Sequence, residues 1–267
     1  MDENELLQVA EADGVARVTL NRPEAFNALS PQLVTRLREY FQELARRPSV
    51  RVVILAGAGK NFCAGLDLKQ SCFDRTPGAD EMMEIQYGIR DIMLAMRRCP
   101  QPIIAILQGA ASGGGFALAL AADVRLGTPD LRMNAAAIKL GLTGGDMGIS
   151  YFLPRMIGSS AAAEYLLTGR FLVAQRAFSL GLISRIGTTD ELEREALALA
   201  EEMLCATPLG LSLTKDGLTH ALDASSLEAV MAIEDRQQVL CTQTPDFSEG
   251  IQAFVEKRKP RYASRSD

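Results

Sequence analysis

The sequence predicts an α/β fold in which β-β-α units repeat within one sheet system and a helical part follows. Residues 15–20, 52–57 and 102–107 are short apolar runs, and their length and β-branched content are typical of buried strands. The run at 52–57 is apolar throughout, which favours helices on both faces of the sheet. Helical patterns lie between these runs and continue almost unbroken from Ser159 onward.

A β-hairpin and a capped helix are predicted at the start of the chain. Residues 6–9 and 15–20 are strand-like runs joined by a turn that ends in Asp-Gly, a common hairpin connection. Ser30 and Pro31 are suited to the N-cap and the first position of a helix. We therefore expect an amphipathic helix from this point to about Ala45.

A small-residue segment and a glycine-rich turn lie in the middle of the chain. Residues 60–68 contain small side chains around one glycine, and the polar stretch 70–80 is predicted to be a loop. A helix over about 81–98 should lead back to the strand at 102–107. The three glycines at 113–115 then fall where this strand turns into a buried helix, which a short strand follows.

Two interpretations of the glycine turn stand about equal on this stretch alone. The first interpretation is an anion or oxyanion site, because main-chain N–H groups at a helix start lack internal partners and the helix dipole favours negative charge there. The other is tight packing of backbone on backbone, which glycine also permits. A phosphate loop is disfavoured, because Gly113-Gly114-Gly115 has neither the dinucleotide nor the P-loop spacing.

One aspartate in the segment 133–150 is a candidate reagent. Four glycines surround Asp146, and a helix is expected to begin near Gly148. An isolated aspartate before a helix is more often a cap than a catalyst, so Asp146 could serve either purpose or both.

The C-terminal part is predicted to be a helical subdomain. We place its start after residue 188, giving an α/β core over 1–188 and a helical subdomain over 189–267. The helical patterns from Ser159 onward cover residues 161–167, 174–180, 191–205, 209–222, 226–240 and 248–257.

Composition excludes several classes of protein. The 267 residues are 48% hydrophobic and 23% charged, as in soluble globular proteins, and the net charge of -5 disfavours a general nucleic-acid or anionic-membrane binder. Five cysteines without a C-x-x-C pair fit reduced thiols, and we predict no metal site. Neither a signal peptide nor an apolar run of about 18 residues is present, so we expect a cytoplasmic protein without membrane partners.

Several separated sequence blocks resemble the enoyl-CoA hydratase/isomerase (crotonase) superfamily. The blocks occur in the family's order over nearly the whole chain, and this resemblance implies a crotonase-like spiral of β-β-α repeats with a C-terminal helical subdomain. The blocks are Asn21-Arg22-Pro23 with Asn27-Ala28-Leu29, Phe62-Cys63-Ala64-Gly65, Asp67-Leu68, Ser112-Gly113-Gly114-Gly115, Leu153-Pro154-Arg155 with Gly158, and Glu249-Gly250-Ile251.

The resemblance also implies a thioester site and partners. It assigns an oxyanion hole to the main-chain N–H groups of Leu66 and Gly114, and it implies a homotrimer or a dimer of trimers. No cofactor is bound permanently, because coenzyme A arrives as part of the acyl-CoA substrate. Residues implied to contact coenzyme A are Ala25, Phe26, Ala64, Asp67 and Leu68, with Phe254 and Lys257 reaching the coenzyme A of a neighbouring subunit. On residue type alone, Lys257 would be a solvated helix end.

Two positions depart from the family pattern. Hydratases of this family use two glutamates, and the matching positions here are Ala117 and Ala137, which cannot transfer a proton. Asp146 is then the leading protic candidate, because related isomerases place an aspartate base nearby and related dehalogenases an aspartate nucleophile. Asp123 and Asp67 are weaker candidates with expected structural roles.

Three functional hypotheses follow from this pattern. The first is an enzyme that stabilises a thioester enolate and isomerises or hydrates an unsaturated acyl-CoA with Asp146 as proton carrier. The second is an acyl- or aryl-CoA hydrolase or dehalogenase with Asp146 as nucleophile. The single histidine, His220, is expected at the surface and not in a catalytic site, which disfavours this second hypothesis. The third is a non-catalytic acyl-CoA-binding paralogue. Ala117 and the alanines at 135–137 suggest room for a bulky acyl group.

Overall fold

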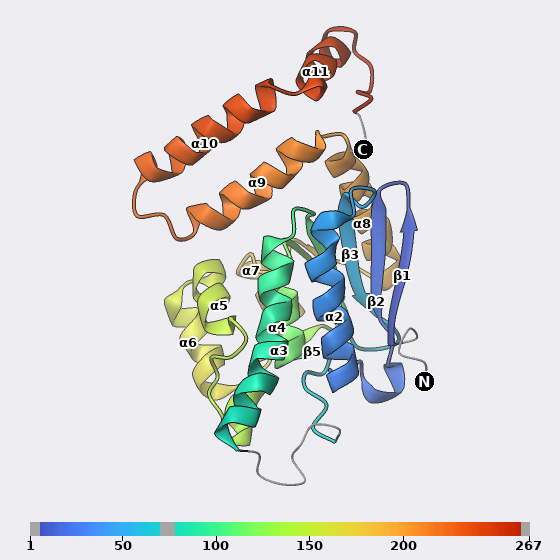
Figure 1. Ribbon diagram of the computed structural model, residues 1–267. Helices are drawn as coiled ribbons and strands as arrows, with labels where there is room; N and C mark the ends of the chain where they lie inside the picture. The colour runs from blue at the N-terminus through green and yellow to red at the C-terminus, as the bar shows by residue number, and fades with distance from the viewer. Residues whose placement is uncertain (1–5, 70–77, 263–267) are drawn as a thin grey trace.

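The computed structural model describes residues 6–69 and 78–262, and six strands of this part form the main sheet (Figure 1). The first two strands pair antiparallel and all later neighbours are parallel. In sheet order the strands are β1 (Leu7–Ala12), β2 (Val15–Leu20), β3 (Val52–Gly57), β4 (Ile103–Leu107), β6 (Val124–Gly127) and β9 (Arg185–Ile186).

The N-terminal predictions are confirmed at the level of single residues. β1 and β2 form the expected hairpin, and both turn residues, Asp13 and Gly14, have positive φ angles, which Asp-Gly tolerates well. Helix α2 (Pro31–Glu43) begins with its proline at the first position. The Ser30 hydroxyl accepts a hydrogen bond from the Leu33 N–H at 3.2 Å and so caps this helix.

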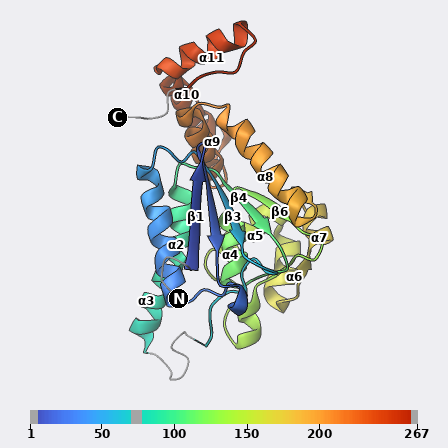
Figure 2. The ribbon, with the colours of Figure 1, turned by 90° about the vertical axis from the view of Figure 1, so that its right-hand side faces the viewer.

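Helices cover both faces of the main sheet, as the apolar strand β3 predicts. In Figure 2, α2 and α3 (Ala79–Arg98) lie on one side of the strands, and α8 (Thr189–Leu204) lies on the other. The buried side chains of α8 that pack on β3, β4 and β6 are Leu192, Ala196 and Ala200. This layering buries the central strands on both faces.

A second, three-stranded sheet is present, and the prediction of one sheet system is wrong on this point. It contains β5 (Ala110–Ser112), β7 (Arg132–Asn134) and β8 (Leu172–Val173), in that order. Strands of two or three residues are too short to show a period in the sequence, so only the fold reveals them. β5 matters for function because it leads directly into the glycine turn and α4 (Gly114–Ala121).

The remaining helices follow the predicted order with small shifts at their ends. Helices α9 to α11 stand beyond one end of the main sheet in Figure 1, while α8 packs on it. The division at residue 188 stays a prediction, although Thr188 does cap α8. These elements are α5 (Ile149–Ile157), α6 (Ser159–Thr168), α7 (Ala174–Ser179), α9 (Pro208–Ala221), α10 (Leu227–Thr242) and α11 (Pro245–Val255), with short 3-10 turns at Pro23–Ala25, Leu44–Arg46 and Ala136–Leu140.

Within the described ranges, no single helix is long and apolar enough to cross a bilayer, and only the bent pair α8 and α9 together would pass on length and composition. Most of the predicted loop at 70–80 lies outside the described residues. Cys72 belongs to this part and also lies outside them.

Candidate active site

Two chain segments that are far apart in sequence lie side by side at the glycine turn. The Cys63 N–H donates to the Ala110 carbonyl at 3.0 Å, and the Ser112 N–H donates to the Cys63 carbonyl at 3.0 Å. A Cβ at Gly115 would clash with the main-chain oxygen of Cys63, so only glycine fits there. The small residues around Gly65 and the glycine triplet therefore form one structural unit.

The peptide group between Gly65 and Leu66 lies near the glycine turn. The Gly65 carbonyl accepts a hydrogen bond from the Leu29 N–H at 2.8 Å. Because a trans peptide points its N–H opposite to its carbonyl, the Leu66 N–H is directed away from Leu29. The glycine turn is close by, since a Cβ at Gly65 would lie only 3.4 Å from the Gly114 nitrogen.

The Gly114 amide lies on the other side of the same region. Gly114 is the first residue of α4, where main-chain N–H groups have no partner inside the helix. Among the described residues, neither the Leu66 nor the Gly114 N–H makes a hydrogen bond to the protein. The fold thus places Gly65, which precedes Leu66, close to the Gly114 amide, and the pairing of the two amides stays a prediction.

Asp146 directly precedes Met147, whose side chain lies close to Gly114. Its carboxylate accepts a hydrogen bond from the Met147 N–H at 2.8 Å, and the Met147 sulfur would lie 3.3 Å from a Cβ at Gly114. Asp146 is half-buried, and this burial raises the pKa of its carboxyl although the Met147 N–H bond opposes the shift.

The capping interpretation of Asp146 is wrong for its side chain. Helix α5 begins at Ile149 with Gly148 as its N-cap, and no side chain caps it. The Ile149 N–H bonds instead to the main-chain carbonyl of Asp146 at 2.8 Å. The carboxylate is therefore not engaged by the helix start.

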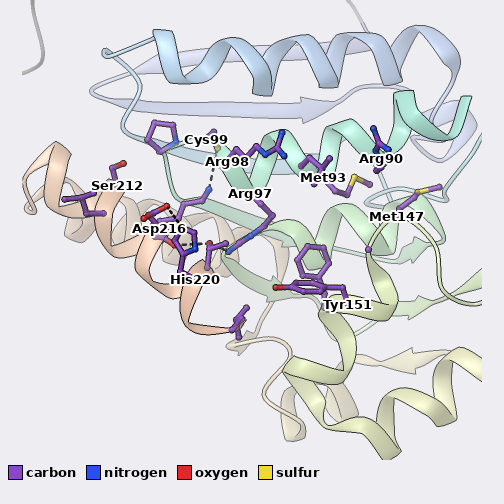
Figure 3. A pocket seen from close by; sticks show the side chains of 18 residues that line it. Arg90, Met93, Arg97, Arg98, Cys99, Met147, Tyr151, Ser212, Asp216 and His220 are labelled. Atoms are coloured by element: carbon purple, nitrogen blue, oxygen red, sulfur yellow. Dashed lines mark hydrogen bonds and ion pairs between the residues drawn. The ribbon is translucent and has the colours of Figure 1, made fainter. Parts of the chain in front are cut away.

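Met147 also lines a cavity of about 790 Å³ between α3, α5 and α9 (Figure 3). Met147 and Gly148 form part of its wall next to the glycine turn. Sequence patterns could not predict this cavity, because its walls come from three helices that are distant in sequence.

Asp67 has a structural partner that sequence analysis missed. Its buried carboxylate pairs with the buried Arg22 guanidinium at 2.9 Å and also accepts from the Lys69 N–H at 3.1 Å. Arg22 donates a further hydrogen bond to the Ala28 carbonyl. The signal in the sequence that could have pointed to this ion pair was the Asn-Arg-Pro block that contains Arg22. The ion pair holds the loop that carries Leu66.

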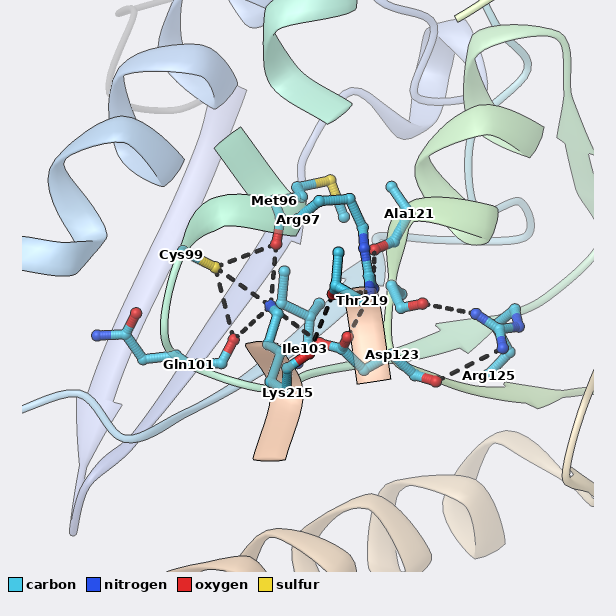
Figure 4. Close-up of polar contacts among 11 residues, drawn as sticks. Met96, Arg97, Cys99, Gln101, Ile103, Ala121, Asp123, Arg125, Lys215 and Thr219 are labelled. Atoms are coloured by element: carbon cyan, nitrogen blue, oxygen red, sulfur yellow. Dashed lines mark hydrogen bonds and ion pairs between the residues drawn. The ribbon is translucent and has the colours of Figure 1, made fainter. Parts of the chain in front are cut away.

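Asp123 is committed to structure as well. It pairs with Arg97 at 2.7 Å and with the buried Lys215 at 3.0 Å, and it accepts from the Ile103 N–H at 2.8 Å (Figure 4). Lys215 comes from α9, so this cluster joins that helix to the core. Both carboxylate oxygens of Asp123 are therefore engaged by partners, which agrees with the structural role expected for this residue.

The residues expected to contact coenzyme A divide into two groups. Phe26 and Leu68 are exposed, Ala25 and Ala64 are half-buried, and the Ala64 N–H donates to the Phe26 carbonyl at 3.0 Å. These four positions lie close to the Leu66 loop. Phe254 and Lys257 lie at the end of α11, at the opposite end of the molecule in Figure 1, so the fold of one chain does not bring them to this loop.

The two alanines at the family's glutamate positions lie in different surroundings. Ala117 is fully buried in α4, and Ala137 is half-buried in the 3-10 turn after β7. His220 is exposed on α9 and lies 3.4 Å from Asp216. Among residues 6–69 and 78–262, no three His, Cys, Asp or Glu side chains are grouped so that they could hold a metal ion.

Comparisons with known proteins show what the chain is similar to. Residues 10–265 match the family model described as Enoyl-CoA hydratase/isomerase. The chain is 40% identical over 253 residues to a Mycobacterium tuberculosis H37Rv protein named "Probable enoyl-CoA hydratase EchA12", covering 92% of this chain and 88% of that one. It is 31% identical over 253 residues to the 1,2-epoxyphenylacetyl-CoA isomerase of Escherichia coli K12, with 94% and 96% covered.

A solved structure has the same fold. The enoyl-CoA hydratase from Bacillus anthracis superposes with a TM-score of 0.91 at 32% identity, covering 97% of this chain and all of that one. The predicted fold class is thereby confirmed, with its α/β core and helical C-terminal part.

Proposed function

Because the chain belongs to the enoyl-CoA hydratase/isomerase family, we propose that it binds an unsaturated acyl-CoA and moves a proton along the acyl chain. The family makes it an enzyme that processes acyl-CoA thioesters. The proposal assigns the thioester oxygen to the Leu66 and Gly114 amides and the proton transfer to Asp146. The observation that carries it is that Gly65 lies close to the Gly114 amide and that Met147, which contacts Gly114, follows the half-buried carboxyl of Asp146.

The amide pair is suited to an enolate. Removing a proton next to a thioester carbonyl places negative charge on the carbonyl oxygen, and fixed N–H donors stabilise that charge more in the transition state than in the substrate. Each such donor commonly contributes a factor of about 10²–10³ in rate. The main-chain bonds on either side of Leu66 hold its amide in a fixed direction, so no reorganisation is needed.

Asp146 is suited to act alone as a base and then as an acid. A single carboxylate can remove a proton at one carbon and return it at another, which isomerises a double bond without the glutamate pair that Ala117 and Ala137 replace. Burial raises the carboxyl pKa towards the range of a useful proton carrier. Hydration through Asp146 is the closest variant, and it has the support that one relative is named as a hydratase.

Turnover by an Asp146→Ala variant tests the proposal. We expect rates with 3-enoyl-, 3,5-dienoyl- or 2-enoyl-CoA to fall by a factor of about 10²–10⁴. The exposed Asp190, changed to alanine, is the matched control and should keep the wild-type rate. Undiminished turnover by Asp146→Ala would remove Asp146 from the mechanism.

Two further measurements separate the alternative functions. A hydrolase or dehalogenase would form an ester on Asp146, which mass spectrometry of the quenched enzyme would detect as a covalent adduct. A non-catalytic paralogue would bind coenzyme A esters but turn none of them over. Either result would replace isomerisation as the assigned activity.

Assembly into a trimer or a dimer of trimers forms part of the proposal. Phe254 is 85% exposed and, with Lys257, lies at the end of α11, far from the Leu66 loop of its own chain. Contact between these residues and the coenzyme A bound to a neighbouring subunit would explain that position. The helical part over 189–267 would then serve oligomerisation.

A further inference from the structure

The loop that carries Leu66 is joined to residues 22–29 by a short main-chain bridge. The Leu29 N–H donates to the Gly65 carbonyl at 2.8 Å, and the Asp67 N–H donates to the Leu29 carbonyl at 3.1 Å. Leu29 and Leu66 are therefore paired as in a parallel sheet, although neither belongs to a strand. A bridge of a single residue pair lacks the neighbouring ladder bonds that hold a strand in register.

The Arg22 guanidinium supplies hydrogen bonds on both sides of this bridge. One nitrogen donates to the carbonyl of Ala28, the residue before Leu29, at 2.5 Å. Another donates to the carboxylate of Asp67, the residue after Leu66, at 2.9 Å. Arg22 and Asp67 are only 6% and 7% exposed, and the planar guanidinium holds its donors in a fixed geometry. One buried side chain thus connects the two segments of the bridge.

Asn27 connects Arg22 to the segment that follows β3. Its side-chain oxygen accepts a hydrogen bond from the Arg22 main-chain N–H at 2.8 Å. Its side-chain nitrogen donates to the carbonyls of Ala58 and Asn61 at 2.9 and 2.7 Å. Asn27 is buried and has a positive φ of 55°, and its neighbour Phe26 has a φ of 53°. Such backbone persists only where the surroundings fix it, so these bonds hold the turn in one conformation.

Asn61 extends the connection to the glycine turn. Its side-chain oxygen accepts a hydrogen bond from the N–H of Ala110, the first residue of β5, at 2.9 Å. β5 ends at Ser112, two residues before Gly114. The loop that carries Leu66 and the strand that leads to Gly114 are therefore tied to one framework of buried and half-buried polar groups.

We propose that this polar network positions the Leu66 N–H relative to the Gly114 N–H and so sets the rate of the chemical step. The inference rests on the proposed function, in which both amides bind the thioester oxygen. Fixed donors stabilise the developing charge best, and a misplacement of about 1 Å can cost a factor of about 10² in rate. The positioning residues that act through the two amides are Arg22, Asn27, Asn61 and Asp67.

Asp67→Asn is the first test variant, and Asp123→Asn is its matched control. Each carboxylate pairs with an arginine and accepts a main-chain hydrogen bond, but Asp123 belongs to the cluster around Lys215. At saturating acyl-CoA, we expect Asp67→Asn to lower kcat by about 10–100-fold, because a neutral amide pairs weakly with Arg22 and releases the Leu66 amide. The folded Asp123→Asn variant should keep kcat within about twofold of the wild type.

The infrared frequency of the thioester carbonyl reports the same effect without turnover. Hydrogen bonds polarise a carbonyl and lower its stretching frequency, and butanoyl-CoA labelled with carbon-13 at the carbonyl isolates this band. We expect the wild type and Asp123→Asn to lower the frequency of the bound ester below that of the free ester. The ester bound to Asp67→Asn should lose most of this lowering.

The outcomes separate this inference from the proposed function. If kcat and the carbonyl frequency of Asp67→Asn match those of the wild type, the network does not position the amides, although a lowered wild-type frequency leaves the thioester site intact. A wild type that binds the ester without lowering its carbonyl frequency would overturn both.

Arg22→Lys gives a second comparison if Asp67→Asn does not fold. An ammonium lacks the planar fork that serves Ala28 and Asp67 together, so kcat should fall about tenfold while KM stays within about threefold. An Arg22→Lys enzyme with the wild-type kcat and carbonyl frequency would overturn the inference.

Discussion

The chemistry proposed for Asp146 depends on the pKa that its surroundings give to the carboxyl. Burial raises the pKa of the Asp146 carboxyl from its ordinary value of 3.8, and the one hydrogen bond it accepts from Met147 only partly offsets that effect. A base must be ionised to accept a proton. The reaction should therefore slow as the pH falls through the raised pKa.

This residue gives the first prediction, a shifted acid limb in the pH profile. We expect kcat/KM to decline at a pH clearly above 3.8, since kcat/KM reports the ionisation of the free enzyme. The measurement is initial rate at low substrate over the range in which the protein stays folded, checked by circular dichroism at each pH. A rate that stays constant down to the ordinary aspartate range would contradict the assignment of Asp146 as base.

At the scale of the elements, the start of α4 gives two adjacent glycines with different constraints. A Cβ at Gly115 would meet the main-chain oxygen of Cys63, which cannot move without breaking the contact between the two segments. A Cβ at Gly114 would lie 2.8 Å from the end of the Leu29 side chain and 3.3 Å from the Met147 sulfur, and both of these can shift.

Gly115→Ala should therefore damage folding, and Gly114→Ala should mainly damage activity. We expect Gly115→Ala to cost about 3 kcal/mol or more of unfolding free energy and Gly114→Ala about 1–2 kcal/mol. Urea unfolding and turnover of the two purified variants measure both effects. Equal losses of stability in the two variants would contradict the described packing.

A buried amine, that of Lys215, helps to hold helix α9 to the core. The Lys215 ammonium bonds to the carbonyls of Met96 and Gln101 at 2.9 and 2.8 Å and pairs with Asp123 at 3.0 Å. Removing the charge leaves Asp123 with Arg97 as its remaining cationic partner and leaves two carbonyls without this donor.

We expect Lys215→Met to lower the free energy of unfolding by about 3 kcal/mol, because breaking one side of a buried ion pair is costly. The neighbouring Thr214 is exposed, so Thr214→Met should change stability by less than about 1 kcal/mol. Chemical denaturation of both variants makes the comparison. If Lys215→Met kept the wild-type free energy of unfolding, the attachment of α9 to the core would not depend on this cluster.

Local signals explain which elements the sequence could predict. Ser30 and Pro31 specify the start of α2, and Asp13-Gly14 specifies the hairpin turn, because both effects act within a few residues. β5, β7 and β8 escaped prediction because their strands are stabilised by partners distant in the chain. The same reason hid the Arg22–Asp67 pair and the cavity behind Met147.

At the scale of the whole molecule, the C-terminal helices expose more apolar surface than one chain can cover. Phe254 and Val255 are 85% and 73% exposed, and Ile251 is exposed on the same helix. Exposed apolar side chains grouped on one element favour contact with another protein surface. A second copy of this chain fits the trimer that we propose.

We predict a solution mass of about three or six times the chain mass of 28.9 kDa. Replacing Phe254 and Val255 together by aspartate should shift the population to smaller species, because a charge would then enter the contact. Light scattering coupled to size exclusion measures the mass of each. The single substitution Leu167→Asp on α6 is the control for an exposed apolar residue elsewhere. A monomeric wild type would contradict the proposed assembly.

The central claim is that two main-chain amides from separate turns hold one thioester oxygen. A crystal structure of Asp146→Asn with an unsaturated acyl-CoA tests it most directly, because the variant should bind the ester without consuming it. We predict the thioester oxygen at roughly 2.7–3.2 Å from both the Leu66 and the Gly114 nitrogen. A bound ester whose carbonyl contacts neither amide, or only one of them, would contradict the account.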